Sequence, residues 1–555
     1  MVVVDGPSRL SRRLLTDRSG VVVIEHSAER DRRPGMSGLR ASALAASTAP
    51  VVIFLDDGSM PTPEWLTAWR RQATAAGGGA PAWIPDEYGW VGVVGRGGRL
   101  APVPAPPLAA APPAVETAEP GAPRFPIPVR DVELAGTAGA ALPLPAGPAS
   151  VLVRLNELPV GCIWVESGAD PGAALRAAVD DHLAEPLRRL RRPGRRAGAG
   201  RHRPGAAARD RARAAARPPP APPAGPLATV VVCTLGREPG LRDVVRAVLD
   251  QTHPAIELVV VDNDPASGQV PVWLAGIDDP RLRVVAQPVR GLSDARNAGL
   301  AAASGEIVVF TDDDARPDRH WVAELVRVFD RDREGVVGCV TGLVTAARLD
   351  TPWELFFEEY GGFGKGYRPK FWSLRPPPAA VANAGEPGER GPLFPYAGGN
   401  YGSGNNMAFR TDRLRALGGF DPALGAGTSV HGGEDLDAFR AVVQAGDTVF
   451  YTPTALVRHL HRDSERALRR QMFGYGTGMA AAVTKQLVAG PDAAMAVLRA
   501  LPAALRVLLA PGSVKNQGKS AEFPLLLTLT ELLGYAVGPL RYLAGRRRVR
   551  ARTRS

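Results

Sequence analysis

The sequence predicts an α/β fold with a mostly parallel central sheet for residues 227–465. Continuous Val- and Ile-rich runs, among them TVVVCT, ELVVVD and EIVVF, are typical of strands buried on both faces. Segments with helical periodicity alternate with these runs, which is the order of elements in a doubly wound sheet. Polar side chains follow the strands where they end, and ligands bind at that edge of such sheets.

Composition divides the 555 residues into seven parts. They are an α/β segment at 1–100, a Pro/Ala linker at 101–123, a small α+β module at 124–190, an Arg/Pro linker at 191–226, the main domain at 227–465, a helical, membrane-associating region at 466–545 and a basic tail at 546–555. Within 124–190, three stretches of alternating apolar and polar residues precede a segment with helical periodicity, which predicts strands followed by a helix. The sequence does not indicate a role for this module.

The net charge of +11 lies in a linker and the tail rather than on the main domain. Residues 187–220 hold twelve Arg and one Asp, and residues 546–555 hold six Arg, which leaves the rest of the chain at −6. Basic low-complexity segments of this kind are usually disordered. We therefore expect no specific nucleic-acid partner, but an attraction to anionic surfaces such as a membrane.

Cysteine usage and the first residues bear on the compartment. Cys162, Cys233 and Cys339 are far apart and lack CxxC spacing, which excludes a disulfide scaffold and argues against a structural zinc site. The opening MVVVDGPSRLSRR has no apolar run of signal-peptide length. These features predict a cytoplasmic protein.

Residues 35–66 resemble residues 291–322 without a gap, with 12 of 32 positions identical. VVVD at 2–5 and GVVG at 92–95 also match VVVD at 259–262 and GVVG at 335–338 in the same order. We interpret 1–100 as a shortened, non-catalytic copy that lacks the first strand. The alternatives are chance similarity and a true start upstream.

Three consecutive aspartates, 312–314, follow the strand EIVVF. Carboxylates one residue apart at a strand end can converge on a divalent ion, and hard oxygen ligands suit Mg²⁺ or Mn²⁺. The competing interpretation is an acidic turn that caps the following helix.

Six strings in order extend this pattern: VVVCTLGR, ELVVVDND, GLSDARNAGLAAASGEIVVFTDDD, GSGNNMAFRTDRLRALGGFDPALG, GGEDLDAFRAVVQAG and RHLHR. Over about residues 228–462 the chain resembles the inverting family-two glycosyltransferases, and the run WELFFEEYGGFGKGY is similar to their mycofactocin-type subgroup in high-GC bacteria. The resemblance implies a GT-A nucleotide-sugar-binding fold, and the segment 1–100 is then a shortened GT-A-like repeat. The helical pattern after residue 465 predicts a helical C-terminal extension.

The resemblance also implies roles for donor-side residues. The residues expected to bind the nucleotide sugar are Thr234, Arg237, Asp262, Asn263, Gly291, Asp294, Arg296, Asn297, Asp312 and Asp313. Asp312 and Asp314 would form the Asp-x-Asp pair that holds the ribose and the metal. A His after the strand TVFYTPTALV would complete the metal shell or contact the leaving diphosphate. His459 is favoured over His461, but the sequence leaves open which of them serves, and the competing interpretation is two surface histidines.

The string GGEDLDAFR would supply the acceptor side. The resemblance implies that Asp435 is the general base, which deprotonates an acceptor hydroxyl, and that Glu434 positions the acceptor. We expect Arg440, further along the same helix, to pair with these acids. The competing interpretation of the Glu-Asp pair is favourable charge at a helix N-terminus.

Two other segments leave alternatives open. The Pro/Gly-rich loop 366–397 is interpreted either as a lid over the donor or as a disordered insertion. The helical region has no 18 consecutive uncharged residues, because Glu531 interrupts 523–540, so interfacial helices are favoured over a spanning helix. The alternative there is a soluble helical subdomain. With the arginines that follow, this predicts a peripheral protein at the inner face of the cell membrane.

Two functions remain from these patterns. The first is a metal-dependent inverting glycosyltransferase that moves a sugar from a nucleotide-diphosphate sugar to an acceptor hydroxyl, in cell-envelope glycan or glycosylated small-molecule synthesis. Its acceptor could be a glycan, a lipid-linked saccharide or a small molecule. The second is a non-catalytic nucleotide-sugar or glycan-binding protein. A third possibility is a scaffold that tethers the protein to a membrane or a nucleic acid, which only the basic linker and the basic tail support.

Overall fold

The computed structural model describes residues 125–134, 147–167, 170–191, 225–237, 240–510, 512–513 and 515–552, together with five strands within residues 1–122. The chain forms two compact units, Met1–Ala122 and Pro123–Ser555. The linker predicted at 101–123 lies outside the described residues, as does most of the one predicted at 191–226.

The five strands that the structure describes in the first unit form a sheet with the order β2-β1-β3-β5-β4. Its strands are β1 (Val2–Asp5), β2 (Val23–His26), β3 (Val51–Leu55), β4 (Ala82–Asp86) and β5 (Gly89–Gly95). β1 is parallel to β2 and β3, whereas β5 is antiparallel to β3 and β4. Most of the segment matched by the predicted repeat lies outside the described residues, and the repeat stays a prediction.

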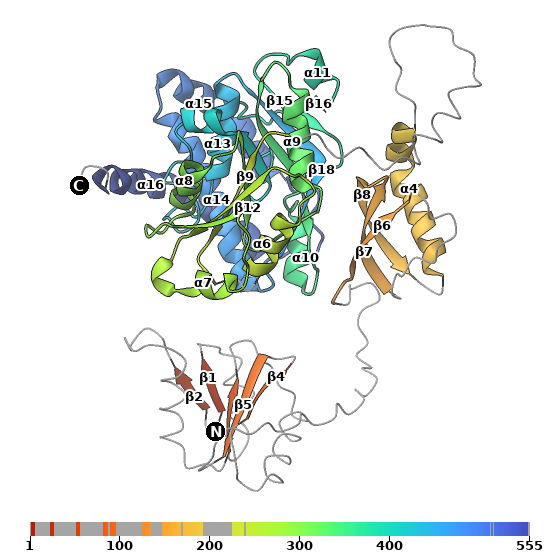
Figure 1. Ribbon diagram of the computed structural model, residues 1–555, viewed down its shortest axis with the longest axis vertical. Coiled ribbons are helices and arrows are strands. Elements are labelled where there is room, and N and C mark those ends of the chain that lie inside the picture. The colour runs from red at the N-terminus through yellow and green to blue at the C-terminus, as the bar shows by residue number, and fades with distance from the viewer. Residues whose placement is uncertain are drawn as a thin grey trace. The chain divides into compact units, whose positions relative to one another are not determined.

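A mixed sheet of ten strands forms the centre of the second unit (Figure 1), in the order β11-β10-β9-β12-β17-β14-β18-β15-β16 with β13 paired to β18. The strands are β9 (Ala228–Thr234), β10 (Ile256–Asp262), β11 (Leu282–Ala286), β12 (Ile307–Asp312), β13 (Ala315–Pro317), β14 (Val337–Ala346), β15 (Lys370–Trp372), β16 (Glu386–Pro387), β17 (Met407–Arg410) and β18 (Thr448–His459). β11, β10, β9 and β12 are parallel, and β17 runs antiparallel between β12 and β14. The predicted α/β class is confirmed, with a sheet more mixed than the Val-rich runs indicate.

The central strand β9 shows why these runs form a sheet covered on both sides. All seven of its residues are buried. Val230 and Val232 join a core with α6 (Leu241–Leu249) and α9 (Trp321–Arg331). Val231 and Cys233 face the opposite core, with α8 (Leu292–Ala302) and α13 (Glu434–Gln444). Alternate side chains of a strand point to opposite faces, so a continuous apolar run fills both cores.

Shorter elements connect these layers. They are η1 (Pro265–Ser267), α7 (Gln269–Leu274), α10 (Pro352–Glu359), α11 (Ala379–Ala382) and α12 (Thr411–Ala416). β15, α11 and β16 lie within the predicted loop 366–397, where the side chains of Trp372 and Val381 are buried. That loop is therefore an ordered extension of the sheet edge rather than a disordered insertion.

The small module consists of β6 (Val129–Glu133), β7 (Gly147–Leu155), β8 (Leu158–Ser167) and α4 (Pro171–Arg191), in the stretches where alternation and helical periodicity predict them. Its sheet has the order β6-β7-β8. Arg154 of β7 pairs with Asp318 at 2.9 Å, and Ile127 donates a backbone hydrogen bond to Leu349 at 2.7 Å. These contacts join the module to the main domain.

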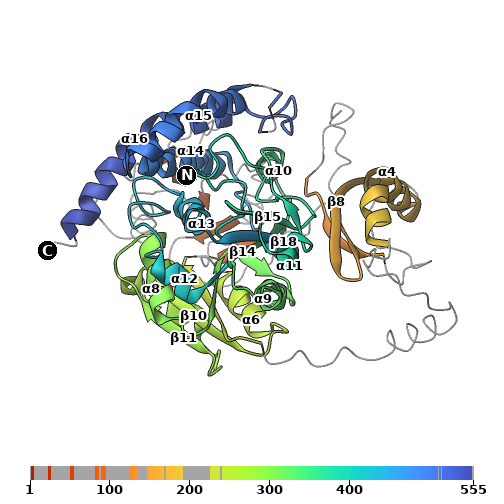
Figure 2. The same ribbon diagram turned by 90° about the horizontal axis from the view of Figure 1, so that it is seen from above.

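The C-terminal helices are α14 (Glu465–Leu487), α15 (Pro491–Leu509) and α16 (Leu525–Arg552), which confirms the predicted helical extension. α14 and α16 pack closely through glycine, since a Cβ on Gly534 would stand 2.4 Å from the Phe473 carbonyl oxygen. Figure 2 shows α15 and α16 along the outer edge of the unit beside α14. The tail predicted to begin at residue 546 is instead continuous with α16 as far as Arg552.

Candidate active site

Asp312, Asp314 and His459 come together at the end of β12 and β18. One ligand atom from each lies within 4.8 Å of the others. His459 Nε2 is 3.1 Å from Asp314 Oδ1, and the buried His459 Nδ1 has no hydrogen-bond partner among the residues that the structure describes. Two carboxylates and one imidazole are a donor set that suits Mn²⁺ or Mg²⁺, so the residues present fit the implied metal.

The two carboxylates of this triad have different environments. Burial raises the pKa of Asp312, although Arg296 opposes the shift. Burial also disfavours ionisation of Asp314, but His459 and Arg462 outweigh it and hold the pKa of Asp314 below its usual value. Arg462 Nη2 lies 3.4 Å from Asp314 Oδ2. A carboxylate that stays ionised without a metal is a ready ligand.

His461, the alternative metal residue, faces a different group. Its Nε2 lies 2.6 Å from Glu358 Oε1, and its ring contacts Phe357 with centroids 4.7 Å apart. Side chains alternate along an extended segment, so residues two positions apart lie on the same face. The two imidazoles are indeed neighbours, with ring centroids 5.6 Å apart, but only His459 reaches the aspartates within the described chain.

Arg296 connects the candidate metal triad, Asp312, Asp314 and His459, to the predicted acceptor side. It is 2% exposed, its Nη1 donates to Glu434 Oε1 at 2.7 Å, and its Nη2 lies 3.3 Å from Asp312 Oδ1. Nη2 also donates to the Gly404 carbonyl at 3.0 Å. Burial raises the pKa of Glu434 to about 7, against the attraction of Arg296. Arg296 thus holds the two acidic groups in place rather than standing free for a ligand.

Asp435 is half-buried in the first turn of α13. Its Oδ2 accepts a hydrogen bond from the Gly404 amide at 2.9 Å, and its Oδ1 accepts one from the Leu436 amide at 2.8 Å. Two amide donors fix the direction of the carboxylate. Gly433 precedes the helix with φ +88°, and its Cα packs against α14, where a Cβ would meet the Gly478 carbonyl at 2.5 Å. Only glycine allows that approach.

The predicted nucleotide residues at the strand ends form a hydrogen-bonded edge. Thr234 donates its hydroxyl to Asp313 Oδ2 at 2.5 Å. Asp262 Oδ1 accepts the Asp264 amide at 3.0 Å. Asn263 accepts the Gly291 amide at 2.9 Å and donates to two carbonyls of the 287–289 segment. The Asn263 side chain therefore anchors the loop before α8.

Two charged residues predicted to contact the donor already have partners. Arg237 Nη2 lies 3.8 Å from Asp264 Oδ2, which also pairs with Arg290. Asp294 Oδ1 accepts a bond from Arg552 Nη2 at 2.6 Å. Arg552 stands at the end of α16, so the last turn of the C-terminal helix reaches the N-terminal turn of α8.

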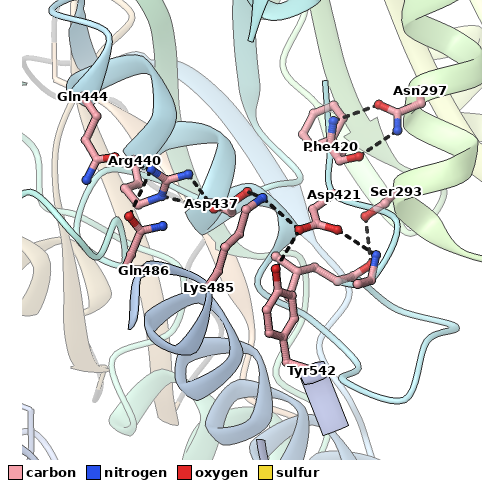
Figure 3. Close-up of polar contacts among 12 residues, drawn as sticks. Ser293, Asn297, Phe420, Asp421, Asp437, Arg440, Gln444, Lys485, Gln486 and Tyr542 are labelled. Carbon is pink, nitrogen blue, oxygen red and sulfur yellow. Dashed lines mark hydrogen bonds and ion pairs between the residues drawn. The ribbon is translucent and has the colours of Figure 1, made fainter. Parts of the chain in front are cut away.

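Asn297 and Arg440 serve contacts that the sequence did not indicate (Figure 3). Asn297 donates to the Phe420 carbonyl at 2.7 Å and accepts the Phe420 amide at 2.8 Å. The expectation that Arg440 pairs with Glu434 and Asp435 is wrong. Arg440 instead pairs with Asp437, with 2.7 Å between Nη2 and Oδ1. The spacing i,i+3 places Asp437 on the Arg440 face of α13, and the earlier acids face the site.

Sequence reasoning missed Asn405, which follows Gly404 in the turn between the two halves of the site. Asn405 is 2% exposed, and within the described part of the chain neither polar atom of its side chain has a hydrogen-bond partner. Its backbone carbonyl accepts the Thr311 hydroxyl at 2.9 Å, so the residue is held in place. A buried amide without partners is costly unless a ligand satisfies it. Nothing in the local sequence SGNN at 403–406 distinguishes Asn405 from the residues beside it.

Residues 229–380 match the family model described as "Glycosyl transferase family 2". This region belongs to glycosyl transferase family 2. The predicted resemblance is therefore confirmed, and the family 2 region contains β9, β12 and the aspartates of the metal triad. Asp435 and His459 lie beyond the matched residues.

Curated relatives agree with this assignment. The pre-mycofactocin glycosyltransferase of Mycobacterium tuberculosis is 27% identical over 269 residues, which is 48% of this chain and 50% of that protein. A glucosyl-dolichyl phosphate glucuronosyltransferase of Haloferax volcanii is 28% identical over 237 residues, 42% of this chain and 68% of that protein. The chain thus spans about half the length of the first of these relatives.

Among solved structures, a mannosyltransferase from Pyrobaculum calidifontis in complex with GDP-Man and Mn²⁺ is similar. The two chains are 21% identical, and the match covers 58% of this chain and 86% of the mannosyltransferase chain, with a TM-score of 0.34.

Proposed function

We propose that the chain is an inverting, metal-dependent glycosyltransferase that uses a nucleotide-diphosphate sugar. The observation that carries the proposal is the meeting of Asp312, Asp314 and His459 within 4.8 Å, joined to the Asp435 side by buried Arg296. A metal-ligand set and a directed carboxylate, linked through one guanidinium, are what transfer from a diphosphate donor needs.

The donor side consists of the triad and the strand ends. Asp312, Asp314 and His459 would hold Mg²⁺ or Mn²⁺, which when bound would offset negative charge on the departing diphosphate. Thr234, Arg237, Asp262 and the segment 291–297 would contact the nucleotide. Asn263 and Asn297 contribute by holding that segment, through Gly291 and Phe420 respectively.

Asp435 would take the proton from the acceptor hydroxyl. As the hydroxyl oxygen bonds to the anomeric carbon, the bond from that carbon to the diphosphate oxygen breaks, and attack from the opposite side inverts the configuration. The hydrogen bonds from the amides of Gly404 and Leu436 fix the direction of the Asp435 carboxylate. Glu434, held by Arg296, positions the acceptor side.

We also propose that α15 and α16 place the protein on the inner surface of an anionic membrane. None of the described helices is long and apolar enough to cross one. Twelve of the eighteen large apolar side chains that the described part of the chain leaves exposed lie between Val488 and Leu540. Leu498, Leu501 and Leu505 recur at helical spacing on α15, as expected for a helix lying in an interface.

A donor panel tests the enzyme proposal. Purified protein is incubated with nucleotide sugars in Mn²⁺ or in chelator, and released nucleoside diphosphate is measured. Metal-dependent release from one donor is expected. Asp435→Asn should lower transfer by at least about 10²-fold while leaving donor affinity within about twofold. Metal-dependent donor binding without release, with every acceptor class tried, would instead favour the non-catalytic binding protein.

A further inference from the structure

The second half of α16 packs on the loop 420–430, which lies between α12 and α13. Tyr542 donates its hydroxyl to Asp421 Oδ2 at 3.2 Å, as Figure 3 shows, and Arg541 Nη1 donates to the Ser429 carbonyl at 3.0 Å. The Tyr542 ring is also buried in a small core with apolar side chains of the same loop. α16 therefore holds this loop by both polar and apolar contacts.

The loop 420–430 in turn holds the start of α8. The Leu292 amide donates to the Ala426 carbonyl at 2.9 Å, and the Ser293 hydroxyl donates to the Leu424 carbonyl at 2.8 Å. These are the first two residues of α8. The loop thus has α16 on one side and the first turn of α8 on the other.

Arg552, in the last turn of α16, also reaches α8 directly. Its Nη2 donates to Asp294 Oδ1 at 2.6 Å, and its Nη1 donates to Asp294 Oδ2 at 3.3 Å. The Asp294 side chain is 14% exposed, so most of the carboxylate is shielded from water. A bidentate pair of this kind fixes the orientation of both partners as well as their distance. Arg552 therefore ties the third residue of α8 to the end of α16.

The first turn of α8 lies between the strand ends and the metal triad. Asn263, which follows β10, accepts the Gly291 amide at 2.9 Å. Arg296, from the next turn of the same helix, lies 3.3 Å from Asp312 of the triad. A diphosphate at the triad whose nucleotide extends along the ends of β9 and β10 would pass this turn. The position of Asp294 and its neighbours therefore bears on donor binding.

We propose that Arg552 is a positioning residue for the donor, because through Asp294 it holds the first turn of α8 in the place where the nucleotide diphosphate binds. The inference rests on the proposed function for the identity of the ligand, whereas the ion pair stands on its own contacts. Residues 229–380 match the family model, so α16 completes the donor side from outside the matched region. The C-terminal helices then serve the active site as well as the membrane contact.

Nucleotide binding tests this inference without turnover. UDP, GDP, CDP, ADP and dTDP are titrated by calorimetry into the full-length protein with Mn²⁺, and the tightest of them is used for the variants. Arg552→Gln should weaken its binding by about three- to tenfold, and Arg552→Lys should recover part of the loss, since it keeps the charge but not the fork. Affinity of Arg552→Gln within about twofold of wild type would overturn the inference.

The matched control is Arg548→Gln, which removes the same charge one turn earlier on α16, where the side chain is exposed. It should bind the nucleotide as wild type does. An equal loss in both variants would show a general effect of positive charge, which is evidence against the Arg552 contact.

Two further measurements separate positioning from a general structural role. The Mn²⁺ affinity without nucleotide and the urea midpoint should be the same in Arg552→Gln as in wild type, since Arg552 belongs neither to the triad nor to the core clusters. A fall in both would mean that the substitution disrupts the domain, and it would refute a positioning role.

A double-variant cycle tests whether Arg552 acts through Asp294. In the Asp294→Asn background, Arg552→Gln should cause no further loss of nucleotide affinity, because the pair is already broken. A further loss as large as the one in the wild-type background would mean that Arg552 acts on the ligand by another route. That result would contradict the proposed action through Asp294.

Hydrogen exchange of the segment 291–297 distinguishes failure of this inference from failure of the proposed function. In the protein without nucleotide, these amides should exchange faster in Arg552→Gln than in wild type or Arg548→Gln. If wild type binds no nucleoside diphosphate, the proposed function fails, and the exchange rates still decide whether Arg552 holds the segment. Unchanged exchange in Arg552→Gln would show that it does not.

Discussion

Arg296 and Glu434 form a buried ion pair, Nη1 to Oε1 at 2.7 Å, across 138 positions of sequence. Arg296 is 2% exposed and Glu434 6%. The pair joins α8, on the proposed donor side, to the first turn of α13, on the proposed acceptor side. It therefore fixes the relative position of the two halves of the candidate active site.

Arg296→Leu should destabilise the protein by about 3–5 kcal/mol, because it leaves the Glu434 carboxylate buried without a partner. Urea unfolding measures the change. The double variant Arg296→Leu/Glu434→Leu should recover a large part of the loss, since it removes both buried charges. A loss below about 1 kcal/mol in the single variant would show that the pair does not hold the halves together.

His459→Ala and Asp314→Asn should each weaken Mn²⁺ binding by at least about tenfold, because each removes one of the three ligand groups. Calorimetry or the electron paramagnetic resonance of free Mn²⁺ gives the affinity. His461→Gln is the matched control, since its Nε2 faces Glu358 instead. Equal losses in His459→Ala and His461→Gln would contradict the assignment of His459.

Glu257 gives a pH-dependent contribution to stability. Burial raises its pKa, but hydrogen bonds from Thr229, Ser304 and Arg283 outweigh that effect and lower the pKa from 4.5 to about 2. Since the folded pKa is depressed, the contribution is complete above pH 4.5 and is lost as the pH falls toward 2.

Glu257→Gln should therefore cost about 1–3 kcal/mol of unfolding free energy at pH 7 and progressively less below pH 4.5. Denaturant unfolding at pH 7, 4 and 3 follows the difference between variant and wild type. Glu306→Gln, an exposed position nearby, serves as the control and should show little change at any of these pH values. A Glu257→Gln penalty independent of pH would rule out this linkage.

Leu505→Glu/Leu529→Glu should lower binding to vesicles of phosphatidylcholine and phosphatidylglycerol by more than about tenfold. The two side chains are 44% and 51% exposed, and each would otherwise bury apolar surface worth about 1.5–3 kcal/mol. Co-sedimentation measures the bound fraction. Val272→Glu, 64% exposed on α7, is the control and should bind as wild type does. Unchanged binding of the double variant would place the membrane contact elsewhere.

Much of the fold and of the donor side was predictable because the signals are local. The strand runs ending at Thr234, Asp262 and Asp312 lie where the sequence predicts them, and parallel strands bring their ends to one edge. Arg440 was misassigned for the opposite reason. Its partner depends on which side of α13 faces Lys485 and α14, and spacing along one helix does not show what packs against it.

The sequence by itself determined the α/β class, the family and the residue types of the candidate active site, since periodicity and motif spacing are properties of the chain. Only the tertiary structure decided that His459 rather than His461 meets Asp314, and that Arg552 reaches Asp294. Such pairings arise when distant segments pack to bury apolar surface, and no local pattern records them.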